Sequence, residues 1–241
     1  NSVGIVILKA QRNYGVDELE ASILEAFKDL PIAIVSIFFV SFLPSIGYKR
    51  AMLIGLGLVY VACITMYFGN SFATAKLLFA TVGVSFALIK VSVYSLIGTV
   101  TENQQEHNSL MSSIEGVFMI GIALTYFLFP AFNSETNPDA WLNVYWLLAG
   151  ISGVSFAFLF LAKSENHVEV PGVNLLDDFK QMFQLMAKLL TIVFVISAFL
   201  FVMIEQGIMS WLPTFNSKVL HLPENISIMM ASILAISLAV G

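Results

Sequence analysis

The sequence predicts an all-α polytopic integral membrane protein, and three observations support this fold class. Hydrophobic residues make up 58% of the chain and charged residues only 11%. The mean hydropathy is +0.87, whereas a soluble domain is about half apolar and about a quarter charged. Apolar runs of the length that a membrane-spanning helix needs, about 20 residues, recur along the chain between polar segments.

The predicted spans follow one another along the chain. Six complete spanning helices are expected at residues 24–46, 51–68, 72–100, 110–132, 141–162 and 190–215. Partial runs at 2–10 and 226–241 precede and follow them. Because the chain lacks an initiator methionine and stops within an apolar run, the sequence predicts an incomplete part of a longer protein.

Short polar segments connect most of the spans, and one connection is much longer. Residues 163–188 are polar at first and then place apolar residues at helical spacing, opposite a charged side. This pattern predicts an amphipathic helix on the membrane surface; a helix that only packs beneath the bundle is the alternative. The chain then divides into an N-terminal six-helix bundle at 1–162, a cytoplasmic linker at 163–189, and the start of a C-terminal bundle at 190–241.

A tight basic loop indicates the orientation. The sequence Gly47-Tyr48-Lys49-Arg50 lies between two predicted spans, and basic residues in short loops are enriched on the cytoplasmic side of membranes. We therefore expect this loop and the 163–188 connection in the cytoplasm.

The span pattern resembles the major facilitator superfamily of secondary transporters, in which two six-helix bundles are joined by a long linker. Between its second and third helices that family has a Gly-x-Leu-x-Asp-Arg-x-Gly-Arg-Lys loop; within residues 40–50, Gly47 and Lys49 match it, and Pro44 stands in place of the acidic residue. The Gly-Pro element common in the fifth helix of proton-exchanging exporters is absent from residues 115–121. The resemblance implies a helical bundle of that type and transport by alternating access, with uptake by symport favoured over export.

Two ionisable residues lie inside adjacent spans. Lys90 and Glu115 are at the same depth on either side of the polar stretch 101–107, so a helical hairpin would bring them together. An ionisable residue at the centre of a span costs about 2.5–3.5 kcal/mol on insertion scales and therefore needs a partner or water. Two interpretations remain open: a salt bridge that only ties the two helices, or a pair that lines a central cavity and binds an anionic or polar group.

Glu205 lies near the middle of the predicted span 190–215 and has no cation within its own run. The family resemblance implies that this helix lines the cavity. Glu205 is then expected to be a proton site, with Gln206 and Trp211 contacting substrate. The alternative is a glutamate that bonds to neighbouring helices or to Lys90.

A third charged group begins the span 24–46. Glu25, Lys28 and Asp29 are spaced to share one helical face. We expect local pairing near the lipid headgroups; a vestibule that contacts substrate is the alternative.

The sequence lacks the signatures of enzymes and metal sites. It has a single cysteine, Cys63, three histidines that are far apart, and no Gly-x-Ser-x-Gly, His-Glu-x-x-His or phosphate-binding glycine loop. It therefore predicts no enzyme activity, catalytic residue, cofactor, metal or nucleic-acid partner. The expected partners are a small-molecule substrate, a proton or other coupling ion, and the lipid bilayer of a bacterial inner membrane.

These expectations define one function and two alternatives. The predicted function is secondary active transport of a small polar or anionic metabolite by alternating access, as proton-coupled uptake. An exporter or antiporter of the same fold is the first alternative. A membrane sensor or scaffold that does not transport is the second.

Overall fold

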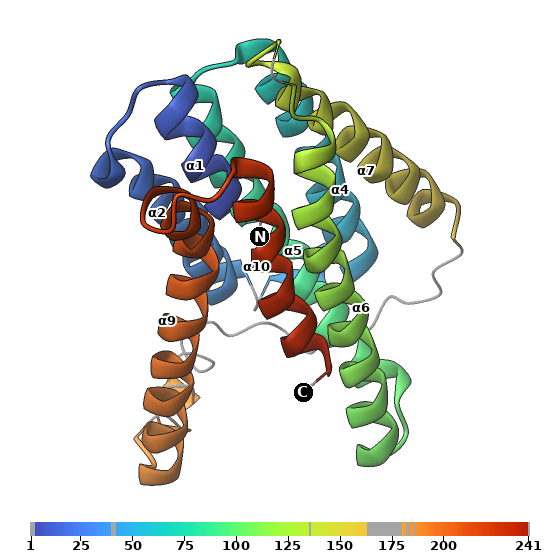
Figure 1. Ribbon diagram of the computed structural model, residues 1–241. Coiled ribbons are helices and arrows are strands. Elements are labelled where there is room, and N and C mark those ends of the chain that lie inside the picture. Colours follow the sequence, from blue (N-terminus) through green and yellow to red (C-terminus); the bar gives the residue numbers. More distant parts are fainter. Residues whose placement is uncertain are drawn as a thin grey trace.

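The computed structural model describes residues 3–39, 42–134, 136–162, 180–181, 184–185 and 187–240, and its regular structure there is helical (Figure 1). The elements are α1 (Val3–Asn13), α2 (Glu18–Phe39), α3 (Leu43–Ile46), α4 (Tyr48–Gly69), α5 (Phe72–Val100), α6 (Gln104–Ala131), the 3-10 helix η1 (Ala140–Asn143), α7 (Val144–Leu161), α9 (Leu189–Lys218) and α10 (Glu224–Val240). The predicted all-α class is confirmed. The amphipathic helix predicted within 163–188 lies largely outside the described residues.

Five helical segments of the described chain are long and apolar enough to cross a membrane. They are Tyr48–Gly69, Phe72–Val100, Gln104–Ala131, Ala140–Leu161 and Leu189–Lys218. The predicted span 24–46 needs correction, because α2 begins earlier and ends at Phe39, and α3 is a separate short helix. Gly47 follows α3 with a φ of 89°, which residues with a side chain rarely adopt, so the chain turns there before α4 begins.

The polar stretch 101–107 is mostly the start of a helix rather than a loop. Only residues 101–103 lie between α5 and α6. The Asn103 side chain accepts a hydrogen bond from the backbone N–H of Glu106 at 2.8 Å, which satisfies one of the free donors at a helix start. This cap explains why α6 begins at Gln104 and not at the predicted residue 110. The hairpin between α5 and α6 keeps the turn expected from the sequence.

The helices fall into two groups in chain order, α1 to α7 and α9 with α10. α5 is the central helix of the first group. It packs against α2, α4 and α6, and α4 also packs against α7. Gly83 makes the contact with α2 possible, because a β-carbon at this position would overlap the backbone carbonyl of Lys28. The close approach places the charged turn of α2, which carries Lys28 and Asp29, beside α5.

The last two helices pack against earlier parts of the chain and against each other. α1 packs against α9, and α10 packs against both α6 and α9. At Gly4 of α1, a β-carbon would lie 2.5 Å from the backbone oxygen of Ser210 in α9. The two backbones are therefore in direct contact, which only glycine permits here.

The packing is concentrated at one end of the bundle, which we call the packed end. Many of the largest fully buried side chains lie near the ends of α1, α4 and α6 and the starts of α7 and α10; they include Leu8, Met66, Tyr126, Phe129, Trp141, Tyr145 and Ile228. In α9 the buried residues begin only at Met209. α6 and α9 diverge toward their first residues, at the lower end of Figure 1, which we call the open end.

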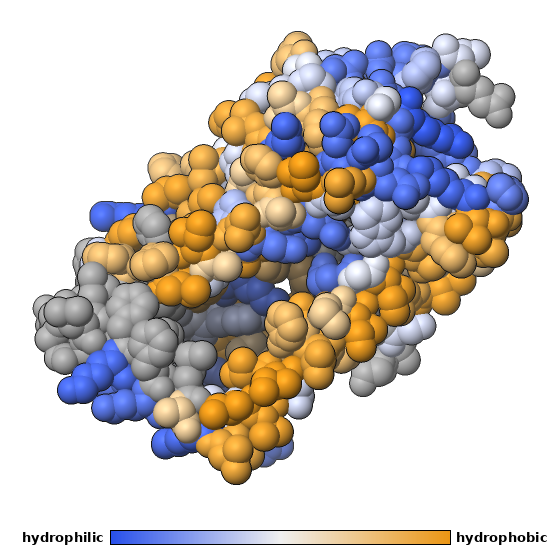
Figure 2. Space-filling model, turned by 90° about the vertical axis from the view of Figure 1, so that its left-hand side faces the viewer, coloured by the Kyte–Doolittle hydropathy of each residue, from blue (hydrophilic) through white to orange (hydrophobic). Residues whose placement is uncertain are grey.

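The outer surface is largely apolar. Large exposed hydrophobic residues occur on every long helix, for example Ile54, Phe158 and Phe194. Figure 2 shows hydrophobic residues along the flank, and hydrophilic residues gathered at the upper, packed end and inside a hollow. This distribution is that of a protein whose flanks contact lipid.

Candidate functional site

A cavity of about 380 Å³ lies between the two groups of helices, and we call it the central cavity. Residues from α2, α5, α6 and α9 line it. Its polar residues are Lys28, Asp29, Lys90, Glu115, Glu205 and Gln206, and its walls include Val82, Phe86, Phe118 and Ile122. A mostly apolar cavity with a few converging polar groups is the usual form of a small-molecule site.

Lys90 and Glu115 form the ion pair that the hairpin geometry predicts. The Lys90 Nζ lies 3.2 Å from the Glu115 Oε1. The Lys90 side chain is 36% exposed and that of Glu115 35% exposed. Because both ends of the pair open on the central cavity, a molecule in the cavity can reach either charge.

Three aromatic rings surround the Lys90 ammonium. Its nitrogen lies 5.5 Å from the ring centre of Phe86, 5.3 Å from that of Tyr94 and 5.2 Å from that of Phe118. Cation–π contacts contribute about 0.5–1 kcal/mol each when exposed and about 2 when desolvated. The ammonium therefore has favourable surroundings even when Glu115 is not bound to it.

Glu205 and Gln206 reach the same cavity from α9, as expected from the sequence. Among the described residues, no ion pair or hydrogen bond engages the Glu205 side chain. Trp211 is not part of the lining; its ring is partly buried against the apolar core.

The charged turn of α2 has a double role that the sequence left open. Lys28 Nζ lies 3.2 Å from Asp29 Oδ1, so the expected local pairing is present. Both residues also line the central cavity. The described lining thus carries two lysines and three carboxylates, and Glu205 is the carboxylate without a lysine partner.

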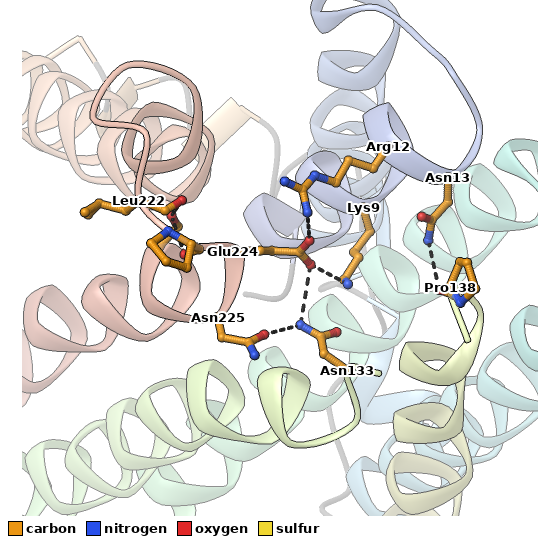
Figure 3. Close-up of polar contacts among 10 residues, drawn as sticks. Lys9, Arg12, Asn13, Asn133, Pro138, Leu222, Glu224 and Asn225 are labelled. Carbon is orange, nitrogen blue, oxygen red and sulfur yellow. Dashed lines mark hydrogen bonds and ion pairs between the residues drawn. The ribbon is translucent and has the colours of Figure 1, made fainter. Parts of the chain in front are cut away.

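A polar cluster closes the packed end, and we call it the clamp (Figure 3). Glu224, the first residue of α10, forms ion pairs with Lys9 and Arg12 of α1. Asn133, just beyond α6, donates to Glu224 at 3.4 Å and to the Asn225 side-chain oxygen at 2.5 Å. Lys9 and Glu224 are 8% and 14% exposed, so the pair is nearly buried. The clamp connects three helices across the boundary between the two groups.

Further contacts reinforce the same end. Lys218, at the end of α9, donates to Glu18 of α2 at 2.7 Å. The Tyr14 hydroxyl donates to the Asn70 side chain at 3.1 Å. Burial, together with the nearby Asp139, raises the pKa of Tyr14 to about 12. The packed end is therefore closed by polar contacts as well as by the apolar core.

At the open end, Lys49 takes a position that the sequence did not reveal. Its ammonium donates to the backbone oxygens of Phe160 at 3.1 Å and Ala162 at 2.5 Å. These carbonyls end α7, where the helix dipole favours a cation. The basic loop therefore ties the start of α4 to the end of α7.

Sequence reasoning missed the aromatic rings and the clamp. Phe86, Lys90 and Tyr94 follow one another at intervals of four, so helical spacing alone could have placed the rings beside the lysine. Glu224 carried a weaker signal: alternation of the spans puts it on the same side as Arg12. Nothing in the sequence fixes which cation it meets.

A helical membrane bundle with a polar cavity between two helix groups is the class of protein that this geometry defines. The model of the Major Facilitator Superfamily matches residues 1–241, so the chain belongs to this superfamily. It is therefore a multi-pass membrane protein of a family of secondary transporters, which are not enzymes. Neither the curated proteins nor the solved structures contain a match.

Proposed function

We propose that this chain takes up a small polar or anionic metabolite together with a proton, and that the central cavity is the binding site. One observation carries the proposal. Lys90, Glu115 and Glu205 come from three helices and converge on one cavity of about 380 Å³ between the two helix groups. Ionisable groups in spans mark substrate and ion pathways by default because their placement is costly.

Lys90 is the group that binds an anionic part of the substrate. Its ammonium is partly exposed to the cavity and remains favourably placed against the rings of Phe86 and Phe118 when Glu115 moves away. Gln206 supplies an amide that donates to or accepts from the substrate. The substrate thereby replaces the ion pair between Lys90 and Glu115.

Glu205 is the proton site in this proposal. Among the described residues of the lining, it adds a third carboxylate to two lysines. A proton on Glu205 removes this excess negative charge, so the loaded cavity is closer to neutral when the protein changes conformation. A less charged site costs less free energy when the cavity closes around it and excludes water.

The conformation fits one half of an alternating-access cycle. The clamp closes the packed end, while α6 and α9 diverge at the open end (Figure 1). If the loop with Lys49 faces the cytoplasm, this is the inward-open state. The proposed location is a bacterial plasma membrane.

Uptake into proteoliposomes tests the proposal. A panel of labelled sugars, carboxylates and amino acids is offered with and without an inward proton gradient. The expected result is gradient-driven accumulation that Lys90→Met or Glu115→Gln reduces at least tenfold. Lys76→Met is the matched control, because Lys76 lies on the same helix but contacts the rings of Phe27 and Phe72, outside the cavity lining.

Three outcomes contradict the proposal. Full uptake in the Lys90→Met, Glu115→Gln double variant means that the pair only ties α5 to α6. Accumulation driven by an outward proton gradient indicates an antiporter. Binding without accumulation of any labelled compound indicates a sensor.

A further inference from the structure

We infer that the substrate is a zwitterion, with a carboxylate and an ammonium attached to the same carbon and an apolar side chain of about the size of a phenyl ring. This inference rests on the proposed function, since it takes the central cavity as the substrate site. It specifies what the ion pair and an adjoining pocket select.

The Lys90–Glu115 pair has to open before either residue binds substrate. A simple anion that takes Lys90 leaves Glu115 without its cation, and a simple cation that takes Glu115 leaves Lys90 without its anion. An uncompensated charge in a partly buried site is costly. A zwitterion supplies an anion to Lys90 and a cation to Glu115 in the same event, so neither charge is left without a partner.

The dimensions of the pair suit such a molecule. The two charged atoms lie 3.2 Å apart, and both side chains are flexible and about one third exposed. They therefore separate by the few ångströms needed to admit the two charges of an α-amino acid. The rings of Phe86, Tyr94 and Phe118 keep the lysine ammonium in place during the exchange.

A second pocket, of about 170 Å³, adjoins the pair between α5 and α6, and we call it the side pocket. Phe86, Lys90, Glu115 and Phe118 line both the side pocket and the central cavity. The other residues of the side pocket are Ile89, Val93, Tyr94 and Ile114. An apolar cavity of about 150 Å³ in another protein accepts benzene, so this pocket accommodates a phenyl or branched aliphatic group.

The two features combine into one recognition pattern. The charged head of the substrate inserts between Lys90 and Glu115, and the apolar side chain enters the side pocket directly beside them. Glu205 stays free for the proton. The structure therefore selects for three substrate features at once: an anion, a cation and an apolar group.

Four probes that differ by one feature test the inference on the complete protein, purified in detergent. L-Phenylalanine has all three features; 3-phenylpropionate lacks the ammonium, 2-phenylethylamine lacks the carboxylate, and L-alanine lacks the large side chain. Binding is measured by calorimetry. We expect phenylalanine to bind at least tenfold more tightly than each of the others.

Each contrary result overturns a defined part of the inference. If 3-phenylpropionate or 2-phenylethylamine binds as tightly as phenylalanine, the site does not require both charges of a zwitterion. If alanine binds as tightly, the side pocket does not select the substrate. If none of the four probes binds, the whole inference is wrong.

A variant that fills the side pocket gives an independent test. Val93→Phe places a ring in the pocket and is expected to reduce the advantage of phenylalanine over alanine to less than threefold. Val154→Phe is the matched control on the outer face of α7, where Val154 is 56% exposed, and it keeps the advantage. An advantage that persists in Val93→Phe contradicts the assignment of the pocket.

Failure of the inference and failure of the proposed function give different results. If the Lys90→Met, Glu115→Gln double variant still transports, the proposed site itself is wrong. If that variant loses transport but the probes show no preference for a zwitterion, the site stands and only the substrate class is wrong.

Discussion

Lys9 in α1 forms a nearly buried ion pair with Glu224, the first residue of α10, and so joins the beginning of the chain to its last described helix. Arg12 and Asn133 bind the same carboxylate (Figure 3). A buried lysine needs such a partner. One glutamate therefore concentrates the polar contacts that close the packed end.

Removal of the Glu224 charge is expected to open the packed end. Glu224→Gln keeps the shape of the side chain but loses charge-assisted hydrogen bonds, each of which contributes about 1.5–3 kcal/mol. A difference of that size shifts a two-state equilibrium by about tenfold or more. The measurement is the labelling of an Ile122→Cys reporter, in a Cys63→Ala background, by a membrane-impermeant maleimide added to intact cells.

Ile122 suits this reporter because it lines the central cavity and is only 5% exposed. Labelling is expected to rise several-fold in Glu224→Gln. Glu20→Gln serves as the control, since Glu20 is an exposed residue of α2 outside the clamp. Equal labelling with and without the Glu224 substitution would show that the clamp does not hold this end closed.

Thermal unfolding of the single and double variants of Lys90 and Glu115 tests whether the two charges stabilise each other. Lys90→Met leaves Glu115 uncompensated, and Glu115→Gln leaves Lys90 without its anion. Since both side chains are more than one third exposed, the cost of either change is roughly 1 kcal/mol rather than the value for a fully buried pair. The double variant removes both charges, so its thermal midpoint is expected to lie above that of either single variant. The reverse order would contradict this account of the pair.

Much of the fold follows from the sequence because the membrane imposes a simple rule. Every span needs about 20 apolar residues and internal hydrogen bonds, so the apolar runs locate α4, α5, α7 and α9 to within a few residues. The helix ends are harder to predict. The cap at Asn103 and the turn at Gly47 depend on local side-chain hydrogen bonds and backbone angles, which hydropathy does not contain.

The candidate site was predictable only where local geometry was sufficient. Lys90 and Glu115 are related by one hairpin, and their contact is confirmed at 3.2 Å. Glu224 meets Lys9 and Arg12 only because α1 and α10 approach in the folded bundle. Trp211 follows Glu205 by six positions and packs against the apolar core rather than in the cavity lining, so its substrate contact stays a prediction. Contacts between distant helices depend on how the helices pack, which hydropathy and local spacing do not specify.

Lys49 is expected to stabilise the open end modestly. Its ammonium binds the carbonyls of Phe160 and Ala162 at the end of α7, and a cation at a helix end contributes about 0.3–1 kcal/mol. Lys49→Met should lower the thermal midpoint, measured by intrinsic fluorescence in detergent, and Lys49→Arg should restore most of the loss. Arg50→Met is the control, because Arg50 is the exposed neighbour in the same turn. An equal effect of both methionine substitutions would point to a general loss of charge instead.

The contact between α1 and α9 is expected to tolerate no side chain. Gly4→Ala would bring a β-carbon 2.5 Å from the Ser210 backbone oxygen, and a backbone atom does not move aside as a side chain does. Overpacking of this kind costs about 1–3 kcal/mol. Gly121→Ala is the matched control, because a β-carbon there meets nothing within 4 Å and alanine favours helix by about 0.5–1 kcal/mol over glycine. The two variants should therefore shift the thermal midpoint in opposite directions, and a stabilised Gly4→Ala would contradict the close approach.

Glu205 gives the sharpest separation of binding from coupling. Glu205→Gln keeps an amide of similar size in the central cavity but cannot take up and release a proton. If Glu205 carries the coupled proton, the variant should lose gradient-driven accumulation at least tenfold while still exchanging labelled for unlabelled substrate across the membrane, because exchange needs binding and the conformational change but no net proton movement. Glu20→Gln is the control, because it neutralises an exposed carboxylate of α2 outside the cavity lining and should keep the coupling. Accumulation that survives in Glu205→Gln would assign the proton to another group, and Glu115, released from Lys90 when substrate binds, would be the next carboxylate to substitute.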